Sequence, residues 1–136
     1  MKIRGTVWVL LFTFTSLLAA CVATNGPYGG RGWELLGERE ADFKVERERI
    51  EVGRREGRFS ELRVAVKGAP LEMYDMVVTF ADGNTFSPNI RHRFEENSWS
   101  REIDLPGDRR VIRSVEFRYR SPNRREGRAT VMLYGR

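Results

Sequence analysis

The sequence contains one cysteine, one histidine and only three lysines, and these scarcities exclude several kinds of chemistry. With Cys21 alone, no disulfide can form within the chain, so a folded domain must be held together by its core. His92 lies between two arginines and has no metal-ligating neighbour in sequence, so neither a metal site of the His/Cys type nor a cofactor is expected. Beyond its first twenty residues the chain also lacks long apolar runs and any clear amphipathic helical pattern.

The sequence nominates no catalytic centre. Its serines stand outside any nucleophile-elbow context. Six carboxylates are candidates for an acid–base pair, but their spacing selects none: Glu38, Asp42, Asp75, Asp82, Asp104 and Asp108. The protein is therefore expected not to be an enzyme, and a carboxylate-dependent hydrolase is kept as the weakest alternative.

The first twenty residues have the layout of a bacterial export signal. Lys2 and Arg4 precede an uncharged stretch over 5–20, whose apolar centre at 7–18 has about the length of a signal-peptide core. This centre is too short to span a bilayer comfortably. The chain is therefore expected to leave the cytoplasm.

The end of this segment predicts a lipid attachment site. The tetrapeptide Leu18-Ala19-Ala20-Cys21 resembles the lipobox of bacterial lipoproteins, in which the cysteine thiol takes the diacylglycerol. Residues 1–20 are thus predicted to be a lipoprotein signal peptide, with Cys21 anchoring the protein on the periplasmic side of the envelope. Val22 after the cysteine favours the outer membrane by the enteric sorting rule. The alternative is an ordinary signal peptide, cut after Ala20 or Ala23, and a soluble periplasmic or secreted protein.

A change of composition separates the signal from the body. Residues 21–32 are rich in glycine and show neither helical nor strand periodicity, which predicts a flexible tether. From residue 33 onward, apolar residues recur mostly at every second position in short runs separated by Gly, Pro, Asn and Asp. Residues 33–136 are therefore predicted to form one domain.

Eight segments of this body read as β-strands: 33–37, 43–46 with 50–52 as one bent strand or two, 59–67, 71–80, 85–94, 99–105, 111–120 and 129–133. Turn signals about every ten residues favour an all-β fold, a single antiparallel β-sandwich of about eight strands, jelly-roll-like, with a small closed barrel as the second choice. Asp82-Gly83-Asn84 predicts a hairpin turn, and Pro88 interrupts the segment that follows it.

Alternation also predicts which side chains point inward. In 59–67 these are Leu62, Val64 and Val66, with Arg63, Ala65 and Lys67 outward. In 99–105 they are Trp99, Arg101, Ile103 and Leu105, and in 111–120 they are Val111, Val115, Phe117 and Tyr119. The aromatic residues are expected in the core rather than on a ligand platform: Trp33, Phe43, Phe59, Phe80, Phe94, Trp99, Phe117 and Tyr119.

The basic residues are almost all arginine, 21 against three lysines, and they concentrate near the C-terminus. The net charge of +5 falls to +3 once Lys2 and Arg4 are removed with the signal. A GC-rich genome alone would favour arginine. Alternatively, the guanidinium groups bind phosphate or carboxylate groups, because their planar forks match these anions.

The pentapeptide Arg-Arg-Glu-Gly-Arg occurs twice, at 54–58 and at 124–128, each time between two predicted strands. If both loops lie at one end of the sandwich, six arginines converge into an anion-binding rim: Arg54, Arg55, Arg58, Arg124, Arg125 and Arg128. Two unrelated Gly-containing turns would explain the repeat equally well.

Five short motifs together resemble a family of short exported proteobacterial proteins of unknown function, the YaaI type: 33–37, 50–53, 57–59, 103–107 and 131–136. The resemblance implies an exported β-domain and no catalytic residues. Cys21 departs from members with an ordinary cleaved signal.

The expected function is thus a non-enzymatic envelope lipoprotein that binds an anionic glycan, a lipid headgroup or a protein, and not nucleic acid. The alternative is a structural or assembly lipoprotein that acts only through protein contacts, for example along an exposed strand edge.

Overall fold

The computed structural model describes residues 30–41, 45–121, 125 and 127–136. Within them the chain forms ten β-strands, one short 3-10 turn, η1 (Arg54–Glu56), and no α-helix. The strands are β1 (Glu34–Glu40), β2 (Val45–Glu51), β3 (Glu61–Lys67), β4 (Leu71–Phe80), β5 (Thr85–Phe86), β6 (His92–Phe94), β7 (Ser98–Trp99), β8 (Ile103–Asp104), β9 (Ile112–Arg120) and β10 (Thr130–Gly135). The all-β prediction is confirmed.

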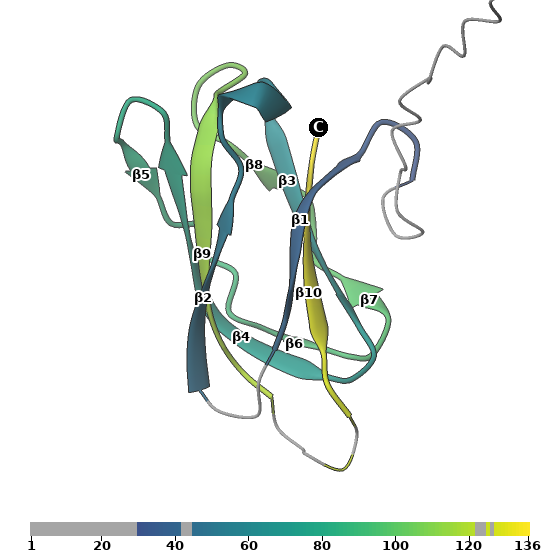
Figure 1. The fold of residues 1–136 in the computed structure, drawn as a ribbon. Coiled ribbons are helices and arrows are strands. Elements are labelled where there is room, and N and C mark those ends of the chain that lie inside the picture. The colour runs from purple at the N-terminus through teal and green to yellow at the C-terminus, as the bar shows by residue number, and fades with distance from the viewer. Residues whose placement is uncertain (1–29, 42–44, 122–124, 126) are drawn as a thin grey trace, which may run out of the picture.

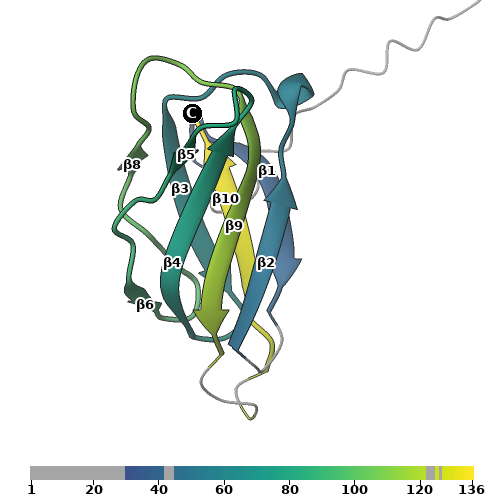
Figure 2. The same ribbon diagram turned by 90° about the vertical axis from the view of Figure 1, so that its left-hand side faces the viewer.

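The strands form two five-stranded antiparallel sheets that face each other (Figures 1 and 2). One sheet has the order β1-β10-β3-β7, with β8 also paired to β3. The other has the order β2-β9-β4-β5, with β6 also paired to β4. The chain alternates between the sheets from β1 to β4 and from β8 to β10, and the two strand orders are those of a jelly roll if β5 with β6, and β7 with β8, are each taken as one interrupted strand.

The structure has ten strands where about eight were predicted, because two of the predicted segments are each interrupted. β5 and β6 pair with opposite ends of β4, and β7 and β8 pair with opposite ends of β3. Pro88, buried between β5 and β6, cannot donate a backbone hydrogen bond to the ladder. The turn at 82–84 forms as predicted, with Gly83 at a φ of 88°.

The core lies between the sheets and is built from alternate residues of the long strands. Its members include Leu62, Val64, Val66, Met76, Val78, Phe80, Ile112, Val115, Phe117, Tyr119, Val131 and Leu133. Every predicted core aromatic in the described residues is buried except Trp99, and Phe43 lies outside those residues. Phe117 and Tyr119 on β9 are central to this core because β9 is flanked on both sides, by β2 and β4.

Strict alternation fails at three places. Trp99 is 45% exposed and Arg101 is also exposed, because the strand predicted over 99–105 breaks after Trp99. Ala65 was expected to face solvent but is buried, since the outer face of its sheet carries a second small cluster. Ile112 is buried because the register between β4 and β9 is irregular here. Thr79 pairs with Ser114 and Phe80 pairs with Ile112, so Arg113 has no paired residue on β4 and the alternation shifts by one position.

No helix among the described residues has the length and apolar character needed to cross a membrane. The predicted signal peptide at 1–20, Cys21 and most of the tether at 21–32 lie outside the described residues.

Candidate anion-binding cleft

The two copies of the arginine-rich pentapeptide lie at opposite ends of the sandwich. η1 follows β2, and Gly53 N–H donates to Ile112 O (3.0 Å) at the start of β9. The second copy follows the last residue of β9, whose nine residues span about 30 Å at roughly 3.3 Å each. Figure 1 shows η1 and the end of β9 at opposite ends of the sandwich. The predicted arginines that the structure describes, Arg54, Arg55, Arg58, Arg125 and Arg128, therefore do not converge into one rim.

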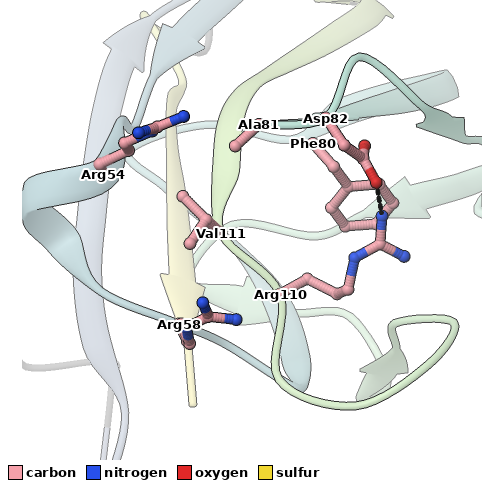
Figure 3. A pocket seen from close by; sticks show the side chains of 7 residues that line it. All are labelled: Arg54, Arg58, Phe80, Ala81, Asp82, Arg110 and Val111. Atoms are coloured by element: carbon pink, nitrogen blue, oxygen red, sulfur yellow. Dashed lines mark hydrogen bonds and ion pairs between the residues drawn. The ribbon is translucent and has the colours of Figure 1, made fainter.

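A cleft of about 450 Å³ opens beside the first copy. It is lined by Arg54, Arg58, Phe80, Ala81, Asp82, Arg110 and Val111 (Figure 3). A smaller hollow lined by Gly53, Arg54, Ala81, Val111, Ile112 and Arg113 adjoins it and shares three of these residues. Three loops build the site: the turn after β2, the end of β4 and the segment before β9. The structure thus brings Arg54 and Arg58 together with an arginine that the sequence did not nominate.

Arg110 is the most firmly held of the cleft arginines. Its Nη2 lies 2.8 Å from Asp82 Oδ2, and its guanidinium carbon lies 3.9 Å from the centre of the Phe80 ring. Nη1 also donates to Pro106 O at 3.2 Å. Backbone bonds in both directions between Phe59 and Arg110 fix the segment that carries the side chain. These contacts orient the guanidinium before any ligand arrives.

Asp82 is held in its ionised form by the turn that it starts. The backbone amide of Asn84 donates to Asp82 Oδ1 at 2.9 Å, and this bond is the main reason why the pKa of Asp82 lies below the ordinary 3.8. Arg110 lowers the pKa further. The Asp82–Arg110 pair therefore persists down to pH values at which an ordinary aspartate takes up a proton.

Other arginines at this end have no carboxylate partner among the described residues. Arg54 and Arg55 make no side-chain hydrogen bond there, and both are exposed. The side chain of Arg58 donates a hydrogen bond to Arg109 O (3.4 Å), and the side chain of Arg109 donates one to Arg58 O (2.9 Å). These two bonds hold the two loops together. We call the six residues Arg54, Arg55, Arg58, Arg109, Arg110 and Arg113 the arginine end. The carboxylates of the same loops are Glu56, Asp82 and Asp108.

Sequence reasoning missed Arg109, Arg110 and Arg113 as site residues. The available signal was the density of arginine after residue 100, which identified the region without a location in space. The isolated bridge between Phe59 and Arg110 brings residues that are far apart in the chain to the same rim. No local pattern encodes such a contact.

The second copy of the pentapeptide is a weaker candidate for an anion site. Arg124 lies outside the described residues, and Arg125 is exposed at the far end. Arg128 Nη1 lies 2.6 Å from Glu40 Oε1, so its charge is already paired. We therefore take the first copy as the candidate site.

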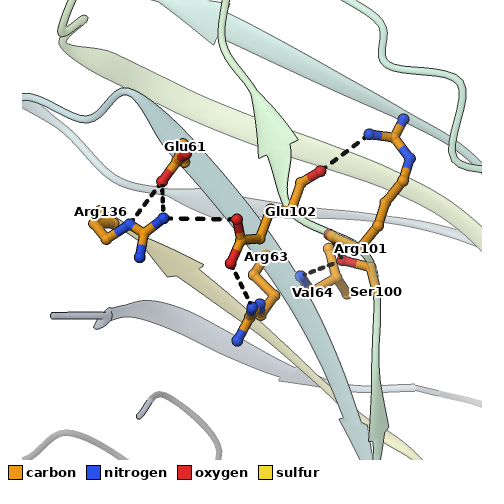
Figure 4. Close-up of polar contacts among 7 residues, drawn as sticks. All are labelled: Glu61, Arg63, Val64, Ser100, Arg101, Glu102 and Arg136. Carbon is orange, nitrogen blue, oxygen red and sulfur yellow. Dashed lines mark hydrogen bonds and ion pairs between the residues drawn. The ribbon is translucent and has the colours of Figure 1, made fainter. Parts of the chain in front are cut away.

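The outer face of the β1-β10-β3-β7 sheet carries a different arginine cluster (Figure 4). The guanidinium of Arg63 lies between two tryptophan rings, 4.6 Å from the centre of Trp33 and 4.9 Å from that of Trp99. Arg63 also pairs with Glu102 at 2.8 Å. The guanidinium carbon of Arg136 lies 4.7 Å from the centre of the same Trp33 ring, and Arg136 forms ion pairs with Glu61 and Glu102. These contacts fasten Trp33, just before β1, and Arg136, the last residue, to the sheet.

Replacing Arg63 with alanine is expected to lower the free energy of unfolding by about 2 kcal/mol. Two cation–π contacts at about 0.5–1 kcal/mol each, a surface ion pair of up to about 1 kcal/mol and the packing of the side-chain stem are lost together. Urea unfolding measures the change. Arg63→Met keeps the stem and should lose about half as much. Wild-type stability in Arg63→Ala would contradict a structural role for the cluster.

The other sequence candidates are separated by the fold. Asp75 pairs with Arg118 at 3.0 Å, and Glu38 lies 3.8 Å from Lys67, so neither faces the cleft. Asp82 is the one carboxylate among the described cleft-lining residues. His92 is exposed on β6 with its ring edge-on to Phe94. Across the described ranges, no three His, Cys, Asp or Glu side chains gather closely enough to hold a metal ion.

Comparison with known proteins identifies a family but no characterised relative. No curated protein and no solved structure matches the chain. A family described as a domain of unknown function, DUF2541, matches residues 7–135, which is almost the whole sequence. The chain therefore belongs to the DUF2541 family.

Proposed function

We propose that the protein is a lipid-anchored module of the bacterial cell envelope that binds an anionic group in the cleft at the arginine end, without catalysing a reaction. The observation that carries this proposal is the convergence of Arg54, Arg58 and Arg110 around one cleft. Of these three, only Arg110 has a carboxylate partner among the described residues.

The cleft chemistry suits a phosphate or carboxylate group. Guanidinium groups bind such anions through paired, charge-assisted hydrogen bonds, which are about twice as strong as neutral ones. Arg110 is fixed by Asp82 and Phe80. Arg54 is exposed and has no side-chain hydrogen bond among the described residues, and Arg58 is exposed with one long bond, to Arg109 O. Phe80, Ala81 and Val111 give the cleft an apolar part, which suits a ligand that joins an anionic group to a small carbon skeleton.

The location rests on the start of the chain. The signal pattern at 1–20 and the lipobox ending at Cys21 support export and acylation. The family match begins at residue 7, so it includes most of this segment. Val22 supports the outer membrane as the destination.

Assembly along a strand edge has less support. β2 borders its sheet, and its sequence, VERERIE, alternates acidic and basic residues. Charged edge strands discourage pairing with another chain. Anion binding in the cleft is therefore the better-supported function.

Calorimetric titration with glycerol phosphate tests the cleft. We expect salt-sensitive binding to the wild-type protein, and binding weakened by roughly a hundredfold or more when Arg54 and Arg58 are both replaced by alanine, since each loses a charge-assisted hydrogen bond of about 1.5–3 kcal/mol.

The matched control is Arg120→Ala, which removes one exposed guanidinium from the opposite end of β9. Its affinity for glycerol phosphate should equal that of the wild type. If glycerol phosphate does not bind at low salt, or binds equally well to the doubly substituted protein, the cleft is not an anion site.

A further inference from the structure

The chain enters the domain at the same end as the cleft. Glu34 at the start of β1 pairs with Gly135, and a side-chain atom placed on Gly32 would lie 3.7 Å from Arg136 Cδ. Arg136 O accepts hydrogen bonds from Ser60 and Glu61, which directly follow the strand bridge between Phe59 and Arg110. Figures 1 and 2 show the start of β1 and η1 at the same end of the sandwich. A short run of contacts therefore links the entry point to the arginine end.

The length of chain before the entry point limits how far this end can be from an anchor at Cys21. Nine Cα-to-Cα steps separate Cys21 from Gly30. Even fully extended, they span about 30 Å at most. This is comparable to the length of the sandwich itself, estimated from the nine residues of β9 at roughly 3.3 Å each. With the sandwich upright, the arginine end can therefore reach the bilayer on a slack tether, whereas the opposite end reaches it only when the tether is almost fully extended.

The charges of the two ends differ. The arginine end has six arginines, against three carboxylates in the same loops, and only Asp82 of the three forms an ion pair with one of them in the described residues. Counted in the same way, the described loops of the opposite end carry Glu95, Glu96, Arg125 and Arg128, whose charges cancel. The loops of the arginine end are therefore more complementary to an anionic surface than those of the opposite end.

We propose that the arginine end docks on the anionic phospholipid headgroups of the membrane that holds the lipid anchor, so that the sandwich stands end-on with its cleft against the bilayer. This inference rests on the proposed function, because it takes both the anchor at Cys21 and anion binding by the cleft from it. It adds the source of the anion, a phospholipid phosphate, and the orientation of the domain.

A lipid anchor would make docking of the arginine end more favourable. The attraction of a basic residue to an anionic membrane falls off within a Debye length, about 8 Å at physiological salt. A short tether keeps the arginine end within tens of ångströms of the headgroups, so docking becomes an intramolecular step at high effective concentration. Each arginine near the surface is then expected to change the ratio of docked to undocked protein roughly fivefold.

The test measures the distance of each end from the headgroups in the acylated, full-length mature protein. Because acylation blocks the thiol of Cys21, a single introduced cysteine is the unique labelling site. Asp108→Cys places a fluorophore at the arginine end, and Glu96→Cys places it at the opposite end. Both positions are exposed, and both substitutions remove one negative charge. The labelled proteins are reconstituted in vesicles of phosphatidylcholine with phosphatidylglycerol, and in vesicles of phosphatidylcholine alone, each containing headgroup-nitroxide lipid.

We expect quenching at position 108 to exceed quenching at position 96 several-fold in the phosphatidylglycerol vesicles. The difference should shrink in phosphatidylcholine alone and at high salt. Arg54→Ala with Arg55→Ala should lower the ratio of docked to undocked protein by an order of magnitude or more, and Arg120→Ala should leave it unchanged. Equal quenching at both positions overturns the proposal, as does a difference that survives the loss of phosphatidylglycerol or of the arginines.

The titration with glycerol phosphate separates the two proposals. If the soluble anion binds in the cleft and the labels show no preferred orientation, the anion site stands and membrane docking is wrong. If the soluble anion does not bind and the labels are quenched equally, both are wrong. If the intact mass shows no acyl chains on Cys21, the anchoring is wrong, and the docking proposal is overturned with it.

Discussion

Replacing Cys21 with serine is expected to move the protein from the membrane fraction to the soluble envelope fraction. The serine hydroxyl cannot replace the thiol in the thioether bond to diacylglycerol. Stable anchoring needs two or more acyl chains, because each buried methylene contributes about 0.8 kcal/mol and a single chain holds only marginally. The loss of membrane association should therefore be nearly complete. Fractionation of a host that has the lipoprotein pathway, followed by intact mass spectrometry, measures both effects.

The control for this experiment is Thr24→Ser, a comparably small change outside the lipobox, which should leave both location and acylation unchanged. A wild-type protein whose mature N-terminus is unmodified Cys21 or Thr24 would show that the signal peptide is of the ordinary kind. In that case Cys21→Ser should have no effect on location.

Replacing Phe117 with alanine is expected to have the largest effect on stability, a loss of about 3–5 kcal/mol in the free energy of unfolding. Phe117 is 1% exposed on β9, which is flanked by β2 and β4, and its ring packs in the core between the sheets. Deleting it removes buried apolar surface and leaves a cavity that a two-sheet core cannot easily close. A domain of this size has only about 5–15 kcal/mol in total, and no disulfide is available to offset the loss. Urea unfolding followed by tryptophan fluorescence measures the change.

Phe86→Ala provides the comparison, because Phe86 is half-buried on the two-residue strand β5 and packs against the core from its edge. Its loss should be clearly smaller than that of Phe117. If Phe117→Ala does not fold, Phe117→Leu should fold with a loss of about 1–1.5 kcal/mol. Equal losses at positions 117 and 86 would contradict the placement of β9 at the centre of the core.

The strands were predictable where one sheet face is buried and the other is wet. Leu62 and Val64 on β3, and Val115 and Phe117 on β9, alternate with half-buried residues, and they occupy the core as expected. The alternation misled where a strand breaks or a register shifts. Trp99 follows the periodicity of Ile103 and Leu105 but lies beside Arg63, outside the main core.

The sequence alone placed two of the residues that line the cleft but not the third arginine. Arginine-rich turns indicated an anion site, and Arg54 and Arg58 do line the cleft. The partner that completes it, Arg110, comes from a loop more than fifty positions along the chain. The identical pentapeptide at 124–128 lies at the wrong end, because β9 runs the length of the sandwich between the two loops.

Local residue patterns therefore led to the prediction of an export signal ending at the lone cysteine, and they were enough to predict the all-β class and most of the strand segments, which the structure has. These properties depend on residue type, on spacing of a few positions and on turn-forming residues, which the sequence states directly. The tertiary structure decided which arginines share a cleft, that Asp82 fixes Arg110, and that the chain enters the domain beside them. The physical reason is that antiparallel pairing between strands far apart in sequence sets which loops meet at each end of a sandwich.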